Sequence, residues 1–375
     1  MNKLFLALAI LLPVLAIGQK KEKPAPKVYN LIIGGYTNAQ GGKGITVYRF
    51  YAETGRTAYL GEIEAQNPTY LTVSPDGKFV YASSETREGS VSAFSFDYVS
   101  GSLKFINKQL TAGANPVHVT IDKDAKNVVA SNYGGTMSVL PVNKDGSLGP
   151  ASQTIKGEGK GAHPQRQTGP HIHSLTFSPD EKYALYADLG ADKITIAKYK
   201  ANKVPAISPE DEVVEKVKPG SGPRHMEFSP NGKFLYLVNE LGGTINAYSY
   251  SKGKLNLVDS LNMSAPEFTG NAGADIHLTP DGRFLYASNR GTANELLAYA
   301  VDPVSGKLTY LQRYPTPTEP RNFVIEPGGR FLILAAQKGN LVQIYKIDKG
   351  NGALVAQNNA ISIAAPTVLK LVSAE

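Results

Sequence analysis

Short apolar stretches with a two-residue alternation recur along this chain, each followed by a tight turn and a second apolar stretch. Residues 70–73 and 79–82 form one such pair, and residues 225–228 and 234–238 form another. Two alternating stretches on either side of a tight turn predict a β-hairpin. No stretch of the sequence keeps the 3.6-residue period of a helix over any length. The pattern therefore predicts an all-β protein.

The turns between these stretches are variants of one sequence pattern, which in its complete form is Ser or Thr, then Pro, then Asp or Asn, then Gly. Pro presets φ and Gly supplies a positive φ, so this is turn chemistry. The pattern recurs roughly every 50 residues, which is the period of a repeat architecture. The six copies, of which the second is degenerate, lie at residues 74–78, 122–126, 178–182, 229–233, 279–283 and 326–330.

Each turn belongs to a larger unit of four strands. A third β-rich stretch follows most turns, at residues 90–96, 244–250, 295–301 and 341–347, and a Gly-x-Leu turn then precedes a fourth stretch. Four strands in each unit of this length are typical of a β-propeller blade.

Six turns give six blades, and the two ends of the chain supply a seventh. Residues 30–37, 44–50 and 59–64 resemble the second, third and fourth strands of a blade, and residues 367–372 resemble the missing first strand. Pairing the two ends closes the ring and removes an open sheet edge. The sequence therefore predicts a seven-bladed β-propeller over residues 28–375, closed by its N- and C-terminal strands.

The residues before the first predicted strand have the layout of an export signal. Lys3 precedes an almost wholly apolar stretch at residues 4–17, and Ala16 and Gly18 provide a small-residue cleavage site. We expect residues 1–18 to be a signal peptide and residues 19–27 to be a polar tether; a membrane anchor is the alternative. The apolar stretch is too short to cross a bilayer comfortably. We therefore expect a periplasmic or secreted protein with no membrane span after cleavage.

The amino-acid composition excludes several kinds of reactive group and of partner. The 375 residues include 39 Lys and Arg, 32 Asp and Glu, and no Cys, for a net charge of +7. Without Cys there are no disulfides, thiol nucleophiles or thiolate metal sites. The basic residues are scattered and form no stripe with interleaved aromatic residues, so we expect no nucleic-acid partner.

Polar residues collect at one end of the predicted hairpins. Residues just before the first strand of a blade and just after its second strand lie together at the end opposite the turn, so they face one mouth of the channel. Five of the six His and three Arg occupy this end, and His277 reaches deeper into the channel. Such convergence at a concave opening is the default hypothesis for a functional site. The candidates are His118, Asn132, His171, His173, Asp188, Arg224, His225, Glu240, His277, Arg290, Arg321 and Asn322.

A structural reading stands beside the functional one for some of these candidates. Asn recurs at the position of Asn132 in other blades, which favours hydrogen bonds within the blade, and Asp188 has the same alternative. A single His at a strand start, such as His118, is more often a satisfied hydrogen-bonding residue than a catalyst.

Several motifs resemble those of a known family. They lie at residues 169–174 (GPHIHS), 222–225 (GPRH), 238–240 (VNE), 276–290 (IH followed by PDGRFLYASNR) and 320–323 (PRNF). Together and in this order they resemble the seven-bladed β-propeller lactonase family, which contains the propeller-type 6-phosphogluconolactonases and the fungal carboxymuconate-lactonizing cycloisomerases. The resemblance extends over residues 28–372.

The resemblance implies a catalytic set of one His, two Arg and a Glu. Matched motif by motif, these are His171 or His173, Arg224, Arg290 and Glu240, and the remaining candidates His118, Asn132, Asp188, His225, His277, Arg321 and Asn322 become substrate-binding residues. The implied activity is hydrolysis of a sugar lactone, either 6-phosphogluconolactone or, because the chain carries an export signal, an unphosphorylated relative such as gluconolactone.

The residue types suit this reaction. Glu240 or a neutral His would act as the base, and the arginines would hold an anion or the developing oxyanion. The sequence has no Gly-x-Ser-x-Gly elbow and no Cys, so direct attack by water is favoured over an acyl-enzyme.

Three alternatives stay open. His171 and His173 are two residues apart on one strand face and could bind a metal, but no third ligand is fixed by spacing, so we expect no cofactor. A propeller that binds a glycan or a protein without catalysis is the second alternative. A lactone-forming cycloisomerase is the third.

Overall fold

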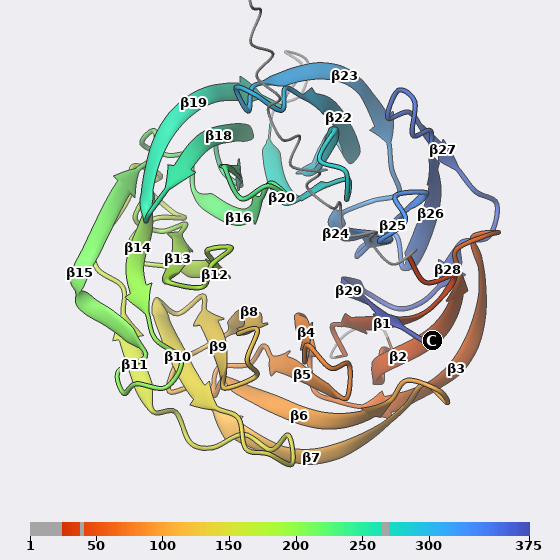
Figure 1. The fold of residues 1–375 in the computed structure, drawn as a ribbon, viewed down its shortest axis with the longest axis horizontal. Helices are drawn as coiled ribbons and strands as arrows, with labels where there is room; N and C mark the ends of the chain where they lie inside the picture. Colours follow the sequence, from red (N-terminus) through yellow and green to blue (C-terminus); the bar gives the residue numbers. More distant parts are fainter. Residues whose placement is uncertain (1–24, 38–40, 264–269) are drawn as a thin grey trace, which may run out of the picture.

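The computed structural model describes residues 25–37, 41–263 and 270–375. Within these residues the chain forms strands, turns and loops without a helix, and the strands make seven sheets arranged as a ring (Figure 1). The predicted seven-bladed β-propeller is thereby confirmed. The described residues contain no helix that is long and apolar enough to cross a membrane. The predicted signal peptide and all but the last three residues of the predicted tether lie outside the described residues.

Each blade is antiparallel, with its first strand nearest the centre of the ring (Figure 1). The inner strands are β4 (Leu71–Val73), β8 (Pro116–Ile121), β12 (Ile172–Phe177), β16 (Pro223–Phe228), β20 (Asn271–Leu278), β24 (Pro320–Ile325) and β29 (Pro366–Ser373). The second strands are β5 (Phe79–Ser84), β9 (Asn127–Asn132), β13 (Tyr183–Asp188), β17 (Phe234–Asn239), β21 (Phe284–Gly291), β25 (Phe331–Ala336) and β1 (Val28–Gly35).

The two outer positions complete each blade. The third strands are β6 (Ser90–Asp97), β10 (Thr136–Pro141), β14 (Lys193–Tyr199), β18 (Thr244–Ser251), β22 (Glu295–Val301), β26 (Leu341–Ile347) and β2 (Gly44–Tyr51). The outermost strands are β7 (Ser102–Leu110), β11 (Gln153–Lys156), β15 (Ile207–Lys216), β19 (Lys254–Asn262), β23 (Leu308–Pro315), β3 (Arg56–Glu64) and, in one blade, β27 (Leu354–Ala356) with β28 (Ile361–Ser362).

The two ends of the chain close the ring in one blade. β29 pairs with β1 in antiparallel register from Tyr29 opposite Ser373 to Gly35 opposite Pro366, and β1 pairs on its other edge with β2. The sheet order is therefore β29-β1-β2-β3, as the sequence predicts.

The repeated turn is held by its own side chains. In the first copy, Ser74 Oγ donates to Asp76 Oδ1 over 2.6 Å and accepts from the backbone N–H of Phe79, while Gly77 adopts a φ of 72°. This arrangement fixes the hairpin so that both ends of its two strands meet on the opposite side of the ring. In the degenerate second copy Ala125 takes the positive φ in place of glycine.

The apolar core lies between neighbouring blades. One cluster, for example, joins Ile32 of β1, Tyr81 of β5 and Val119 of β8, all fully or almost fully buried. Packing of sheet against sheet holds the inner strands in place and thereby fixes the side chains at the mouth of the channel.

Candidate active site

β-Bulges place several inner-strand side chains. The pairing of inner and second strands skips one residue in each of four blades, and the skipped residues are Val117, His173, Arg224 and Arg321. A bulge locally bends a strand and re-aims its side chain. All four bulged residues line the same pocket.

The pocket lies at the end of the blades opposite the Pro-Asp-Gly turns and has a volume of about 300 Å³. Its described lining residues are Tyr36, Glu85, Asn115, Val117, Tyr133, Arg166, His173, Arg224, Glu240, Arg290 and Arg321. Five of the residues predicted from sequence therefore meet here, drawn from four different blades: His173, Arg224, Glu240, Arg290 and Arg321.

Glu240 is the electrostatic centre of this pocket. Its Oε2 lies 3.0 Å from Arg224 Nε and 3.0 Å from Arg290 Nη2, and its Oε1 lies 2.7 Å from Arg166 Nη2. Burial raises the pKa of Glu240, but the three guanidinium groups outweigh burial and bring it down to about 2. Glu240 is therefore a fixed anion at neutral pH.

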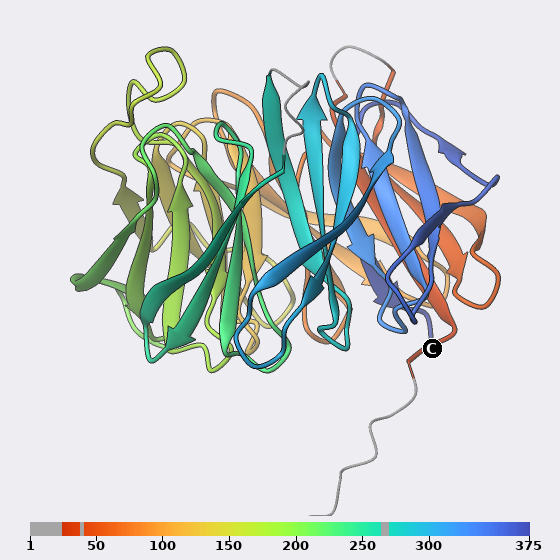
Figure 2. The same ribbon diagram turned by 90° about the horizontal axis from the view of Figure 1, so that it is seen from above.

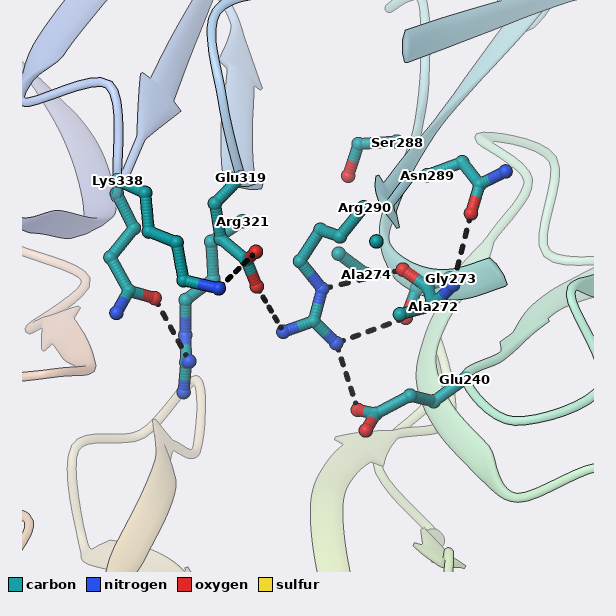
Figure 3. Close-up of polar contacts among 12 residues, drawn as sticks. Glu240, Ala272, Gly273, Ala274, Ser288, Asn289, Arg290, Glu319, Arg321 and Lys338 are labelled. Atoms are coloured by element: carbon teal, nitrogen blue, oxygen red, sulfur yellow. Dashed lines mark hydrogen bonds and ion pairs between the residues drawn. The ribbon is translucent and has the colours of Figure 1, made fainter. Parts of the chain in front are cut away.

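Arg224 and Arg290 are each held by more than one partner. Arg224 also donates to the carbonyl oxygen of Ala274, and burial together with the charge of Arg290 lowers its pKa to about 9, so it stays protonated at neutral pH. Figure 3 shows the Arg290 guanidinium between Glu240 and Glu319, with Lys338 on the far side of Glu319. Charges of alternating sign thus cross this part of the rim and fix the orientation of Arg290.

A second cluster of polar side chains lies at another part of the pocket wall. Arg321 Nη1 donates to Gln337 Oε1 over 3.1 Å, and its guanidinium lies over the ring of Tyr36 at 5.5 Å from the centroid. The hydroxyl of Tyr36 donates to Glu85 Oε1 over 2.7 Å. Burial raises the pKa of Tyr36 to about 12, so the phenol keeps its proton.

The two histidines of the HxH motif are separated by the structure. His173 lies at the pocket wall, whereas His171 stacks on Tyr133 with ring centroids 4.2 Å apart and places its Nδ1 2.6 Å from the backbone oxygen of Tyr133. Burial and the charge of Arg224 hold the pKa of His173 well below its usual range, so its imidazole is neutral. Of the two, His173 is the one in a position to meet a ligand.

The histidines one residue further along the inner strands form a buried layer beneath the pocket. The rings of His118 and His225 lie 5.6 Å apart, and His225 Nδ1 lies 2.7 Å from Asp275 Oδ1. Asn322 and His277 contact the other carboxylate oxygen of Asp275. These four predicted residues, His118, His225, His277 and Asn322, are thus brought together, but below the pocket lining.

Asn132 and Asp188 are not brought to the pocket. The amide of Asn132 donates to Thr136 Oγ1 in its own blade, and Asp188 Oδ1 accepts the backbone N–H groups of His171, Gly190 and Ala191. Both side chains therefore bond locally, Asn132 to a side chain of its own blade and Asp188 to the backbone of the adjoining turn.

The sequence matches the family model of the lactonases described as a 7-bladed beta-propeller, over residues 30–371. The chain belongs to this lactonase family. It is 36% identical to the 6-phosphogluconolactonase of Formosa agariphila over 335 residues, which cover 86% of this chain and 94% of that protein. It is 34% identical to the 6-phosphogluconolactonase of Bacillus subtilis, with 90% of this chain and 97% of that protein covered.

This chain is also similar to a protein of solved structure. The periplasmic gluconolactonase PpgL of Pseudomonas aeruginosa superposes on this lactonase-family chain with a TM-score of 0.86 and 33% identity, and the match covers 93% of this chain and all of PpgL.

Other pocket residues of this lactonase-family protein are absent from the candidates chosen by sequence. Glu85 and Tyr133 follow second strands at the same offset as Glu240 and Arg290, so the repeat register carried a signal for them. Tyr36 follows β1, the second strand of the closing blade. Arg166 lies in the long loop between β11 and β12, outside the repeat, and no repeat signal could identify it.

Two further features bear on the location and type of site. In the described part of the chain no three His, Asp or Glu side chains are grouped as a metal site requires. A wider groove of about 530 Å³ lies at the opposite end of the blades, but it is lined by turn residues such as Ser74 and Asp76, which hydrogen-bond to each other. The mouth with the arginines is therefore the better candidate site.

Proposed function

We propose that this protein hydrolyses a sugar lactone by attack of water, in the pocket around Glu240. The observation that carries the proposal is the set of guanidinium groups of Arg166, Arg224 and Arg290, held on one carboxylate at the wall of a small polar pocket. The family membership and the named activities of similar proteins support the same reaction class.

The arginines fit the electrostatic demand of ester hydrolysis. When water adds to the lactone carbonyl, negative charge develops on the carbonyl oxygen, and pre-oriented donors at that oxygen lower the barrier. Arg224 and Arg290 are almost completely buried and already oriented by Glu240, so they need little reorganisation. Glu240 suits the role of organising these cations better than the role of base, because both of its oxygens are occupied and its pKa is about 2.

The charge of the pocket favours a substrate that carries an anion. Among the described lining residues, four arginines face two glutamates, which leaves an excess of positive charge. Guanidinium groups bind phosphate and carboxylate through paired hydrogen bonds. We therefore place a phosphorylated or carboxylated sugar lactone ahead of a neutral one.

We also propose export to the periplasm or the medium. The signal-like residues 1–18 support it, and the similar protein PpgL is named as periplasmic. The mature chain would then begin at Gln19, which N-terminal sequencing of the native protein tests. A cytoplasmic protein that retains Met1 would contradict this proposal and leave the lactonase proposal standing.

The lactonase proposal is tested with purified residues 19–375. Hydrolysis of 6-phosphogluconolactone and of gluconolactone is measured with and without a chelator. Arg224→Met should lower kcat/KM by about 10²–10³, the cost of losing one oxyanion donor. The matched control is Arg56→Met, on the exposed outer strand β3. If the wild type hydrolyses neither lactone, a binding propeller becomes the better reading; if Arg224→Met matches the wild type, the pocket is not the site.

A further inference from the structure

One carboxylate oxygen of Glu85 accepts a hydrogen bond, and the other has no hydrogen-bond donor among the described residues. Its Oε1 accepts the hydroxyl proton of Tyr36 over 2.7 Å. Its Oε2 is buried, and no described residue of the chain donates a hydrogen bond to it. Glu85 as a whole is half-buried, but an oxygen atom that is buried without a hydrogen-bond donor is costly, so its presence at a pocket wall needs an explanation.

Glu85 and Glu240 face the same pocket in contrasting surroundings. Three guanidinium groups occupy both oxygens of Glu240, which is locked as an anion. Glu85 has a single hydrogen-bond donor, and that donor is neutral because Tyr36 keeps its proton. When two carboxylates in one site differ in this way, the environment assigns them different roles.

The other candidate bases are poorly placed to accept a proton. A proton on Glu240 would have to displace an ion pair. A proton on His173 would create a buried cation beside Arg224, and burial together with that repulsion holds the pKa of His173 well below its usual range. Protonation of Glu85 breaks no ion pair of the kind that holds Glu240, because Arg321 acts on its charge only from beyond the Tyr36 hydroxyl.

Glu85 also lines the pocket that holds the arginines. We infer that Glu85 is the general base of the lactonase reaction, with Tyr36 as the positioning residue that fixes its carboxylate. This inference rests on the proposed function. The Glu85 carboxylate accepts a proton from the attacking water while the water oxygen forms a bond to the lactone carbonyl carbon. The electron pair of the C=O bond moves to the carbonyl oxygen, where the guanidinium groups stabilise it.

Collapse of this tetrahedral intermediate completes the reaction. The C=O bond re-forms, the ring C–O bond breaks, and the leaving alkoxide takes the proton from Glu85. The product is an open hydroxy acid, which releases its carboxyl proton to solvent, and Glu85 returns to its carboxylate form. No metal, cofactor or second substrate besides water enters the balance.

Glu85→Gln tests the inference, because the amide keeps the shape and still accepts from Tyr36 but is not a base. We expect kcat to fall by about 10²–10⁴ with KM within about threefold of the wild type. We also expect the fall of kcat/KM at acidic pH, caused by protonation of the base, to disappear from the residual rate. Glu88→Gln, three residues further along and exposed, is the matched control for loss of one negative charge.

Tyr36→Phe provides a second test, which stays informative even if Glu85→Gln fails to fold. Loss of the hydroxyl removes the donor that favours the charged carboxylate, so the acidic limb of the kcat/KM profile should move to higher pH and kcat should fall about tenfold. A Glu85→Gln loss below tenfold, or an unchanged acidic limb in both variants, overturns the assignment while wild-type hydrolysis keeps the proposed function. If the wild type hydrolyses no lactone, both the proposed function and the assignment of Glu85 are wrong.

Discussion

At the scale of single residues, the groups around a side chain decide its chemistry in this protein. Glu240 is an anion fixed by three arginines, Glu85 has one oxygen to which no described residue donates, and His173 is kept neutral by burial and by neighbouring positive charge. In the layer below, burial lowers the pKa of His277, but the carboxylates of Asp275 and Glu227 outweigh burial and raise it to about 10. Histidine is therefore neutral at His173 in the pocket wall and cationic at His277 in the layer beneath it.

His277→Gln should destabilise the protein in a pH-dependent way. The pKa of His277 rises from about 6.5 in the unfolded chain to about 10 in the fold, so its contribution is complete below pH 6.5 and is lost as the pH rises through 10. Removing charge-assisted hydrogen bonds to Asp275 and Glu227 should cost about 2–3 kcal/mol at pH 6. Urea unfolding of the variant and the wild type at pH 6 and pH 10.5 measures both differences.

The double variant Glu227→Gln/His277→Gln supplies the control for this prediction. If the two residues form an ion pair, the free energies of unfolding of the single variants should be non-additive at pH 6 and additive at pH 10.5. An equal loss of stability at both pH values would mean that His277 contributes through packing rather than charge.

At the scale of strands and loops, β-bulges and one long loop build the pocket. The bulges turn His173, Arg224 and Arg321 toward the mouth, and the loop between β11 and β12 brings Arg166 across to Glu240. Figure 2 shows this loop, in yellow-green, rising above the blades on the face away from the C-terminus. Gln167 anchors the loop through hydrogen bonds to Leu189 and Asp192.

Arg166→Met should reduce activity without reducing stability. The Arg166 side chain is 43% exposed, against 3% for Arg224, so its ion pair adds little to the fold. Loss of one guanidinium donor to an anionic substrate should lower kcat/KM about tenfold, which corresponds to about 1.4 kcal/mol. The loss should be larger for 6-phosphogluconolactone than for gluconolactone, and Tm should stay within about 2 °C.

Lys160→Met, exposed on the same loop, is the control for the Arg166 variant. Equal losses on both lactones would indicate that Arg166 stabilises the oxyanion rather than a substrate anion. An unchanged kcat/KM on both would remove Arg166 from the substrate contacts altogether.

The strands and the mouth could be predicted from sequence because a repeat fixes them. A two-residue alternation and a recurring turn give each strand its register, and the register places Arg224, Glu240 and Arg290 at one end. The contribution of Arg166 could not be predicted, since loop conformation follows from contacts such as Gln167 with Asp192 and not from periodicity. Which histidine of the HxH motif meets the pocket depends on a bulge at His173, which an alternating pattern does not reveal.

At the scale of the whole molecule, one blade holds the ring together. The chain enters the ring at β1 as a second strand and leaves it at β29 as the inner strand of the same blade (Figures 1 and 2). β29 also carries contacts to both neighbouring blades: Thr367 Oγ1 donates to the Thr69 carbonyl, and the Leu369 N–H donates to Asn322 Oδ1. Pairing of β29 with β1 therefore also fixes Asn322, which belongs to the buried layer beneath the pocket.

Deletion of residues 367–375 should unfold or severely destabilise the protein. It removes the strand that pairs with β1, exposes a sheet edge, and takes Val368 and Leu369, both fully buried, out of the core. Each such side chain is worth about 1.5–3 kcal/mol, so the total approaches the stability of an ordinary domain. Thermal unfolding should show a Tm lowered by more than about 10 °C or no cooperative transition. The control is deletion of residues 374–375 alone, which lie beyond β29 and whose loss should change Tm by no more than about 2 °C. A truncated protein that melts within a degree or two of the full chain would show that the ring does not depend on this closure.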